Sequence, residues 1–175
     1  GGVWGVGFED VLKLEGGKFK TVTKAGYGEL GSSIDHFTVT ADGKIWAATF
    51  KGVALWDGTA WTVEAKEKIG AGDDLLQGIA VDKTGNVFVA STHKVHVKTG
   101  GAWKDIDLTK AGQTRELFFE GMALAPDQSV YALASAALLH IGPGVDAVAS
   151  VPLGKDSIPS FGPLSVSANG SVAAK

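Results

Sequence analysis

The sequence predicts an all-β protein with a β-propeller fold, built from four-stranded blade repeats of about 42 residues. Three observations predict it. The chain has 25 glycines against 5 prolines, and its short apolar stretches alternate with turn signals, which is typical of strands joined by tight turns. A strand-like segment recurs along the chain at a nearly constant period. A second strand pattern precedes the full copies of that segment in register.

The recurring segment is the second strand of each repeat. Its third residue recurs at spacings of 42, 42, 43 and 42 residues, and a period of this size indicates a repeat architecture. The copies are Gly2–Phe8, Lys44–Phe50, Asn86–Thr92, Ser129–Ser135 and the shorter Ser171–Lys175, with Trp4, Trp46, Phe88, Tyr131 and Ala173 at the third position.

The preceding strand alternates large apolar residues with small ones, which suits an inner strand between neighbouring sheets. Its copies are Phe37–Val39, Ile79–Val81, Met122–Leu124 and Leu164–Val166. Asp-Gly and Asn-Gly pairs at Asp42 and Asn169 predict two-residue hairpin turns with positive φ angles between the two strands.

Two further strands complete each repeat, and we name the four strands A to D from the axis outward. Strand C is predicted at Val11–Leu14, Val53–Trp56, Val95–Lys98 and Leu138–Ile141. Strand D opens with Phe19, Trp61 or Trp103, and we interpret these tryptophans as blade-packing residues rather than a carbohydrate platform. The units are then a partial blade at 1–33, blades at 34–74, 75–117 and 118–160, and a partial blade at 161–175.

The two ends of the chain repeat the same second strand, since residues 1–6 and 170–175 occupy the same repeat position. A closed propeller has a single slot for that strand. We therefore expect a piece of a larger propeller of roughly six to eight blades, with closure of four blades as the alternative. Its exposed blade edges are expected to pair with the remaining blades of a parent chain or with a second copy.

Charge and composition exclude several classes of partner and chemistry. A net charge of −3 provides no positive field for nucleic acid, and the absence of an 18-residue apolar run argues against membrane insertion. The absence of cysteine excludes disulfides, thiol nucleophiles and thiolate metal sites. No activated serine or histidine is visible, so we predict no catalytic residue and lean against an enzyme.

The best candidate site is the channel mouth on the face formed by the D-to-A and B-to-C loops. Asp35, Gln77 and Glu120 occupy equivalent positions at the head of strand A. Three such side chains could bind a polar ligand or a hard cation such as Ca²⁺, or could simply line a water-filled opening. His36 adjoins Asp35, and His93 in a B-to-C loop could reach the same face.

Two segments carry a resemblance to known propeller repeats. The motif in Asp42–Gly58 resembles the two-component-regulator type of repeat, and Gly78–Ala90 resembles an NHL-type repeat. The resemblance extends over essentially the whole chain but implies only blades, together with an extracytoplasmic, periplasmic or secreted location. The sequence itself assigns no compartment. The axial trio is similar to the metal cage of gluconolactonase-type propellers, which implies a hydrolase or lactonase alternative.

These observations favour a non-enzymatic binding scaffold that recognises a protein, peptide or glycan on the loop face. The D-to-A connections vary most between repeats, as recognition surfaces on rigid scaffolds do, although solvated loop tips would vary in the same way. The first alternative is a metal-dependent hydrolase or lactonase with a cation at the channel. The second is a structural part of an extracytoplasmic sensor or assembly.

Overall fold

The computed structural model describes residues 2–7, 10–24, 27–31, 34, 36–112, 117–135, 137–143, 147–151 and 164–174. In these ranges 17 strands form five antiparallel sheets, and hydrogen-bonded neighbours follow one another along the chain. The helical elements there are single turns, namely α1 (Tyr27–Leu30), α2 (Lys66–Ile69) and the 3-10 helix η1 (Leu108–Ala111). The predicted all-β class is confirmed.

Three of the sheets are four-stranded and follow the predicted order from A to D. Blade 2 comprises β4 (His36–Val39), β5 (Ile45–Ala48), β6 (Gly52–Trp56) and β7 (Trp61–Ala65). Blade 3 comprises β8 (Leu76–Val81), β9 (Val87–Ser91), β10 (Val95–Thr99) and β11 (Ala102–Asp105). Blade 4 comprises β12 (Phe119–Leu124), β13 (Val130–Ala134), β14 (Ala137–Ile141) and β15 (Val148–Val151).

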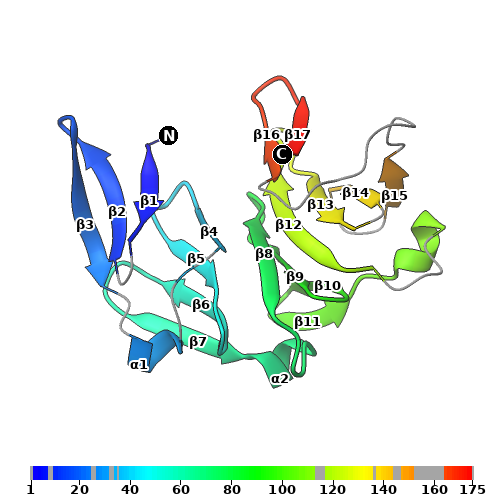
Figure 1. The fold of residues 1–175 in the computed structure, drawn as a ribbon, viewed down its shortest axis with the longest axis horizontal. Helices are drawn as coiled ribbons and strands as arrows, with labels where there is room; N and C mark the ends of the chain where they lie inside the picture. The colour runs from blue at the N-terminus through cyan, green and yellow to red at the C-terminus, as the bar shows by residue number, and fades with distance from the viewer. Residues whose placement is uncertain are drawn as a thin grey trace.

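Two smaller sheets flank these blades. Blade 1 has three strands, β1 (Trp4–Val6), β2 (Asp10–Glu15) and β3 (Lys18–Lys24), and β16 (Leu164–Val166) pairs with β17 (Val172–Ala174) as a hairpin. Figure 1 shows the sheets arranged in an arc, with β4, β8 and β12 toward its inside and β3, β7, β11 and β15 toward its outside. Strand β8 contacts both β4 and β12, and β12 contacts β16, so the A strands stack side by side as predicted.

Apolar side chains fill the seams between the blades. Phe88, Leu139 and Phe119 belong to the largest cluster, which joins blades 3 and 4. A second cluster, with Val53 and Val89 among its members, joins blades 2 and 3. Because each sheet buries side chains against its neighbours, the stability of every blade depends on the next one.

The A strands approach one another so closely that one of them requires glycine. A Cβ atom on Gly78 would lie 2.8 Å from both the Cβ and the backbone nitrogen of Met122 in the next blade. The strand is also bulged just before this point, since the β8–β9 register shifts between Leu76 and Gly78. The same shift occurs in β12 between Phe119 and Gly121. Gln77 and Glu120 are therefore the extra residues of two equivalent bulges.

The prediction of two-residue turns between strands A and B is wrong. Thr40 N–H donates to the Lys44 carbonyl, and Gly43 N–H donates to the Thr40 carbonyl, so three residues form the loop. Positive φ is confined to the last of them, at 84° for Gly43 and 73° for Gln128, which replaces glycine in blade 4. This is a type I turn followed by a left-handed residue.

The outer-strand tryptophans pack blades together, as predicted. The indole N–H of Trp61 donates to the Thr23 hydroxyl of the preceding blade at 3.2 Å. The indole N–H of Trp103 in blade 3 donates to the carboxylate of Glu64 in blade 2 at 2.6 Å. Among the helices of the described residues, none is long and apolar enough to cross a membrane.

Candidate functional site

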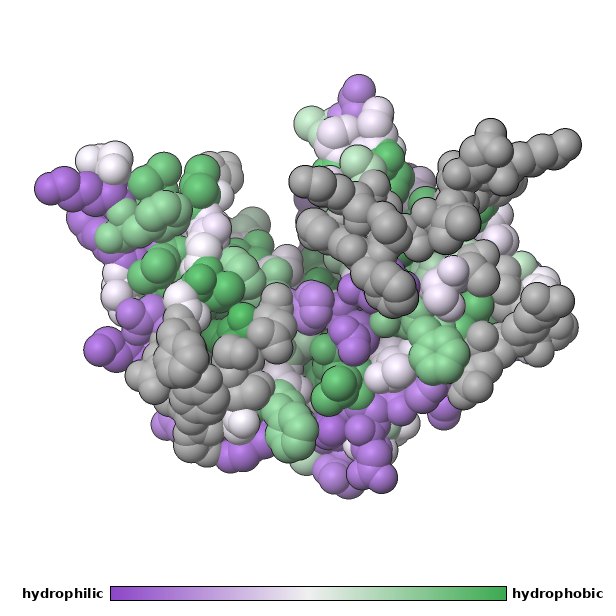
Figure 2. Space-filling view, in the orientation of Figure 1, coloured by the Kyte–Doolittle hydropathy of each residue, from purple (hydrophilic) through white to green (hydrophobic). Residues whose placement is uncertain are grey.

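The loop face of blades 2 to 4 carries three large apolar side chains that are exposed to solvent. Phe50 lies in the turn between β5 and β6 and is 58% exposed, while Leu75 and Phe118, at 51% and 49%, lie immediately before β8 and β12. We call Phe50, Leu75 and Phe118 the apolar patch. Figure 2 shows apolar side chains reaching the surface of the arc as green areas among purple and white ones.

At the seam between blades 2 and 3 the apolar patch borders a small cavity. Its volume is about 160 Å³, and Phe50 and Leu75 form part of its wall. His36 and Gln77, two of the predicted site residues, line the same cavity. The Lys66 ammonium lies 5.0 Å from the centroid of the Phe50 ring. The cavity thus combines apolar walls with an imidazole and an amide.

At the next seam the patch continues through Thr92 and His93. The Leu75 N–H donates to the Thr92 hydroxyl at 3.2 Å, and the Phe119 N–H donates to the Thr92 carbonyl at 2.8 Å. The rings of His93 and Phe118 meet edge to face, with centroids 5.1 Å apart. Thr92 is therefore hydrogen-bonded to both of the segments that carry Leu75 and Phe118. His93 lies beside the patch.

A chain of polar contacts runs from His93 into blade 3. His93 Nδ1 lies 2.9 Å from Asp74, whose other oxygen accepts the Ser91 hydroxyl at 3.0 Å. Ser91 Oγ lies 3.1 Å from Nε2 of His96, and His96 Nδ1 lies 2.8 Å from Asp105. Lys94 pairs with the second Asp105 oxygen at 2.7 Å. Charged groups at the surface are thereby joined through two buried side chains.

The buried part of this chain has the arrangement of an Asp-His-Ser triad but does not act as one. Ser91 and His96 are both 0% exposed, and the Ser91 hydroxyl also contacts Asp74. A nucleophile must reach its substrate, and this hydroxyl does not. The contacts instead hold Asp74, and through it His93, in place on the loop face.

Burial controls the protonation of the network. Burial lowers the pKa of His96, and the neighbouring Asp105 carboxylate opposes this effect. Burial raises the pKa of Asp105, but hydrogen bonds from Lys94 and His96 outweigh it and hold this pKa below its ordinary value. The same balance, with His93 and Ser91 as donors, lowers the pKa of Asp74.

This network is specific to blade 3. His96 pairs with Asp105 across the β10–β11 ladder, and the corresponding pair in blade 2 is Ala54 with Val63. In blade 4 the buried Leu139 occupies the position of His96. An apolar residue at the position of His96, paired with Val63 in blade 2 and with Ser150 in blade 4, satisfies the blade fold, so the His96–Asp105 pair of blade 3 is an addition to the fold.

The predicted axial trio is only partly described. Asp35 lies outside the described residues. Gln77 lines the small cavity, and Glu120 has both carboxylate oxygens buried without a hydrogen-bond partner among the residues that the structure describes. Burial raises the pKa of Glu120. No group of three or more His, Cys, Asp or Glu side chains that could hold a metal ion occurs in the described part of the chain.

The sequence analysis missed the apolar patch. A signal was present, because Leu75 and Phe118 are 43 residues apart and each directly precedes strand A. Single exposed apolar residues are normal at a protein surface, but apolar side chains that gather on one face are informative.

Stacked four-stranded sheets with inner A strands define a β-propeller, and the chain contains this architecture. No family model matches the sequence, and no curated protein matches it. The structure is similar to virginiamycin B lyase from Staphylococcus aureus, with a TM-score of 0.70 and 12% identity, over 98% of this chain and 58% of the lyase.

Two further solved structures are similar. The extracellular domain of a proposed hybrid two component system from B. thetaiotaomicron has a TM-score of 0.68 and 15% identity, over 99% of this chain and 23% of that one. YCF48 bound to D1 peptide has a TM-score of 0.57 and 11% identity, over 81% of this chain and 46% of that one. The chain thus spans less than two thirds of each structure, and identities this low show the fold alone.

Proposed function

We propose that this chain is a propeller binding module that recognises an extended segment of a protein on the loop face of blades 2 to 4. The observation that carries the proposal is the apolar patch, with three large exposed side chains at two adjacent seams. Apolar surface rimmed by polar groups marks protein interaction sites. The module is proposed to bind its partner without transforming it.

The chemistry of the patch favours a peptide over a glycan. The cavity of about 160 Å³ beside Phe50 and Leu75 is smaller than typical small-molecule pockets of about 300–1,000 Å³, but it suits one apolar side chain. His36 and Gln77 at its wall can bond to peptide groups. The similar structure of YCF48 contains a bound peptide, which supports the same class of ligand here.

Charged substitutions in the patch are expected to abolish peptide binding. Peptides of about twelve residues selected from a random display library against the wild-type protein should carry apolar anchors. The Leu75→Asp/Phe118→Asp variant should bind these peptides at least about 100-fold more weakly, because two anchor contacts are lost. Titration calorimetry of the synthesised peptides measures the change.

Phe19 provides the matched control, since it is 53% exposed on the outer strand β3 of blade 1. The Phe19→Asp variant should bind the selected peptides as the wild-type protein does. Thermal unfolding of all variants should be similar, because the substituted side chains are at the surface. Equal loss of binding in the Phe19 and patch variants would refute the proposal. Peptides whose affinity is unchanged by either substitution would refute it as well.

The buried carboxylate of Glu120 favours a second candidate function, a metal-dependent hydrolase or lactonase with a cation at the channel. An unpaired buried carboxylate is costly, and a bound Ca²⁺ would remove that cost. Gln77, the equivalent bulge residue of β8, supplies another oxygen on the same face. Such an activity would need the cation, so cation binding is tested first.

Calcium is expected to raise the melting temperature of the wild-type protein if this second candidate is correct. Because burial raises the pKa of Glu120, binding should also release a proton, which buffers of different ionisation enthalpy would reveal in calorimetry. The Glu120→Gln variant keeps the shape and loses the charge, so both effects should vanish. A wild-type protein indifferent to Ca²⁺ contradicts the cation site and leaves peptide binding untouched.

The setting proposed for the module is extracytoplasmic, as part of a sensor or a larger propeller assembly. The similar extracellular domains of two component systems support this setting. In such an assembly the remaining blades of a parent chain or a second copy would cover the free edges of β1–β3 and β16–β17.

A further inference from the structure

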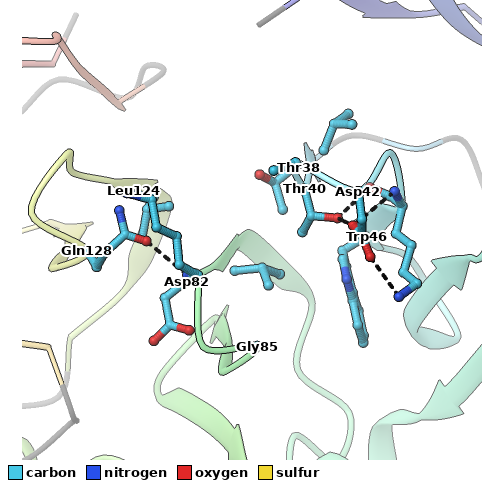
Figure 3. A pocket seen from close by; sticks show the side chains of 13 residues that line it. Thr38, Thr40, Asp42, Trp46, Asp82, Gly85, Leu124 and Gln128 are labelled. Atoms are coloured by element: carbon cyan, nitrogen blue, oxygen red, sulfur yellow. Dashed lines mark hydrogen bonds and ion pairs between the residues drawn. The ribbon is translucent and has the colours of Figure 1, made fainter.

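A second cavity lies at the opposite end of the blades, among the A–B turns. Its volume is about 560 Å³, within the range of small-molecule sites. It is lined by the ends of strands β4 and β8 with their turns, together with Trp46, Leu124 and Gln128. Figure 3 shows the Trp46 ring nearly edge-on beneath Asp42, with Asp82 and Gly85 on the other side of the cavity.

Trp46 forms an aromatic wall of this cavity. Its side chain packs partly against the cluster between blades 2 and 3, yet it remains only partly buried. Its indole N–H forms no hydrogen bond with the residues described and is not enclosed, unlike the bonded N–H groups of Trp61 and Trp103. Trp46 therefore presents both an apolar ring and an open donor to a ligand.

The two carboxylates that line the cavity are satisfied within the protein. Asp82 is 7% exposed and accepts hydrogen bonds from the backbone and side chains of Thr84 and Asn86. Asp42 pairs with the Lys44 ammonium at 2.7 Å. Neither carboxylate is left to bind a cation, and the paired Lys44 does not favour an anion. Lys83 adds an ammonium donor to the lining, and together these groups favour a ligand with many hydroxyl groups.

The wall opposite Trp46 is held rigid by a strained residue. Gln128 has a φ of 73°, which is unfavourable for a side chain other than glycine. Its amide oxygen accepts the Lys83 N–H of the neighbouring blade at 2.9 Å, and its amide nitrogen donates to the Pro126 carbonyl at 3.1 Å. This cross-blade bond fixes the A–B turns of blades 3 and 4 relative to each other.

The same construction occurs one repeat earlier. A cavity of about 880 Å³ at the seam of blades 1 and 2 is lined by Trp4, 42 residues before Trp46, and by the A–B turn of blade 2. Lys13 Nζ lies 5.5 Å from the centroid of the Trp4 ring. At the seam of blades 3 and 4 the equivalent Phe88 is only 1% exposed. The ring at this position is partly buried in blades 1, 2 and 4 (Trp4, Trp46 and Tyr131), and the two cavities border Trp4 and Trp46.

We propose that these two seams form carbohydrate-binding subsites, with Trp46 and Trp4 as the surfaces on which sugar rings pack. The weakly positive C–H groups of a pyranose suit the negative face of an indole. Hydroxyls of the sugar would bond to the Trp46 N–H, the Thr38 hydroxyl and the Lys83 ammonium around the cavity. This site lies away from the loop face and does not depend on peptide binding there.

Fluorine NMR of the wild-type protein labelled with 5-fluorotryptophan tests the proposal without altering the fold. Cellohexaose, xylohexaose, mannohexaose and chitohexaose serve as probes. At least one should shift the Trp46 and Trp4 signals saturably, while Trp56, Trp61 and Trp103 stay unchanged. Single Trp→Phe variants assign the five signals. The absence of a saturable shift with all four sugars up to about 5 mM, or shifts confined to the outer-strand tryptophans, would overturn it.

A matched pair of variants measures the contribution of the ring. Trp46→Leu removes the aromatic wall, and Trp56→Leu makes the same change in strand β6 of the same blade, away from the cavity. Sugar affinity should fall at least about tenfold for Trp46→Leu only. An equal fall in both variants would contradict the assignment. The Leu75→Asp/Phe118→Asp variant should bind the sugar normally, which separates this site from the loop face.

Discussion

Replacing Gly52 with alanine is expected to destabilise the protein by about 4 kcal/mol. Gly52 opens strand β6 with a φ of 147°, a conformation that residues with side chains rarely adopt. A Cβ atom there would lie 2.0 Å from the carbonyl oxygen of Glu64 on the paired strand β7. Backbone must move to admit it, so part of the blade 2 ladder would be lost. Urea-induced unfolding measures the change.

Gly58 separates the two causes of this loss of stability, which are the unfavourable φ angle and the close contact with strand β7. Its φ is 106°, but a Cβ atom at this position would meet no atom within 4 Å. The Gly58→Ala variant should therefore lose only the conformational cost of about 1–2 kcal/mol. Equal stability of the two variants would show that the close contact between Gly52 and β7 is not a feature of the folded protein.

Replacing Asp105 with leucine is expected to cost about 3 kcal/mol, because it leaves the fully buried His96 without its acceptor. Lys94 would also lose its partner, but that exposed pair contributes little. The double variant His96→Leu/Asp105→Val introduces the apolar types found at the equivalent positions of other blades, Leu139 and Val63. It should recover most of the loss in urea unfolding.

The pH dependence of stability distinguishes this network from simple packing. The pKa of His96 is lowered in the folded state, so its contribution to stability is complete above the ordinary histidine value of 6.5 and declines as pH falls below it. The lowered pKa of Asp105 acts in the same direction at lower pH. The double variant should lose the decline that begins near 6.5. A double variant no more stable than Asp105→Leu, with the wild-type pH profile, would contradict this account.

The repeat predicted the fold well, because every blade must bury the same strands against its neighbours and the strand patterns therefore recur at a fixed period. Trp46 and Phe88 mark one strand in every repeat, and the structure places them in β5 and β9. The turns were less predictable. An Asp-Gly pair is compatible with two-residue and three-residue loops, and the hydrogen bonds around Gly43 select the longer one.

The candidate site was less accessible to sequence reasoning, because it is formed by residues from different blades. Gln77 and Glu120 could be aligned from the repeat. The bulges that contain them are register shifts in the strand pairing, and no residue type in the sequence predicts such a shift. The pairing of His96 with Asp105 depends on the ladder register of β10 and β11. The apolar patch combines Phe50, from a turn of blade 2, with Leu75 and Phe118, from the segments that lead into blades 3 and 4. These segments are close together only because the sheets stack.

Hydrogen exchange of the wild-type protein with and without a selected peptide tests the loop-face proposal most directly. Bound peptide should slow exchange in the segments around Phe50, Leu75, Thr92 and Phe118, which border the patch. Exchange in the A–B turns at 40–44, 82–86 and 125–129 should be unchanged. Protection confined to those turns or to the outer strands β3, β7 and β11, with no change around the patch, would contradict the proposed binding face.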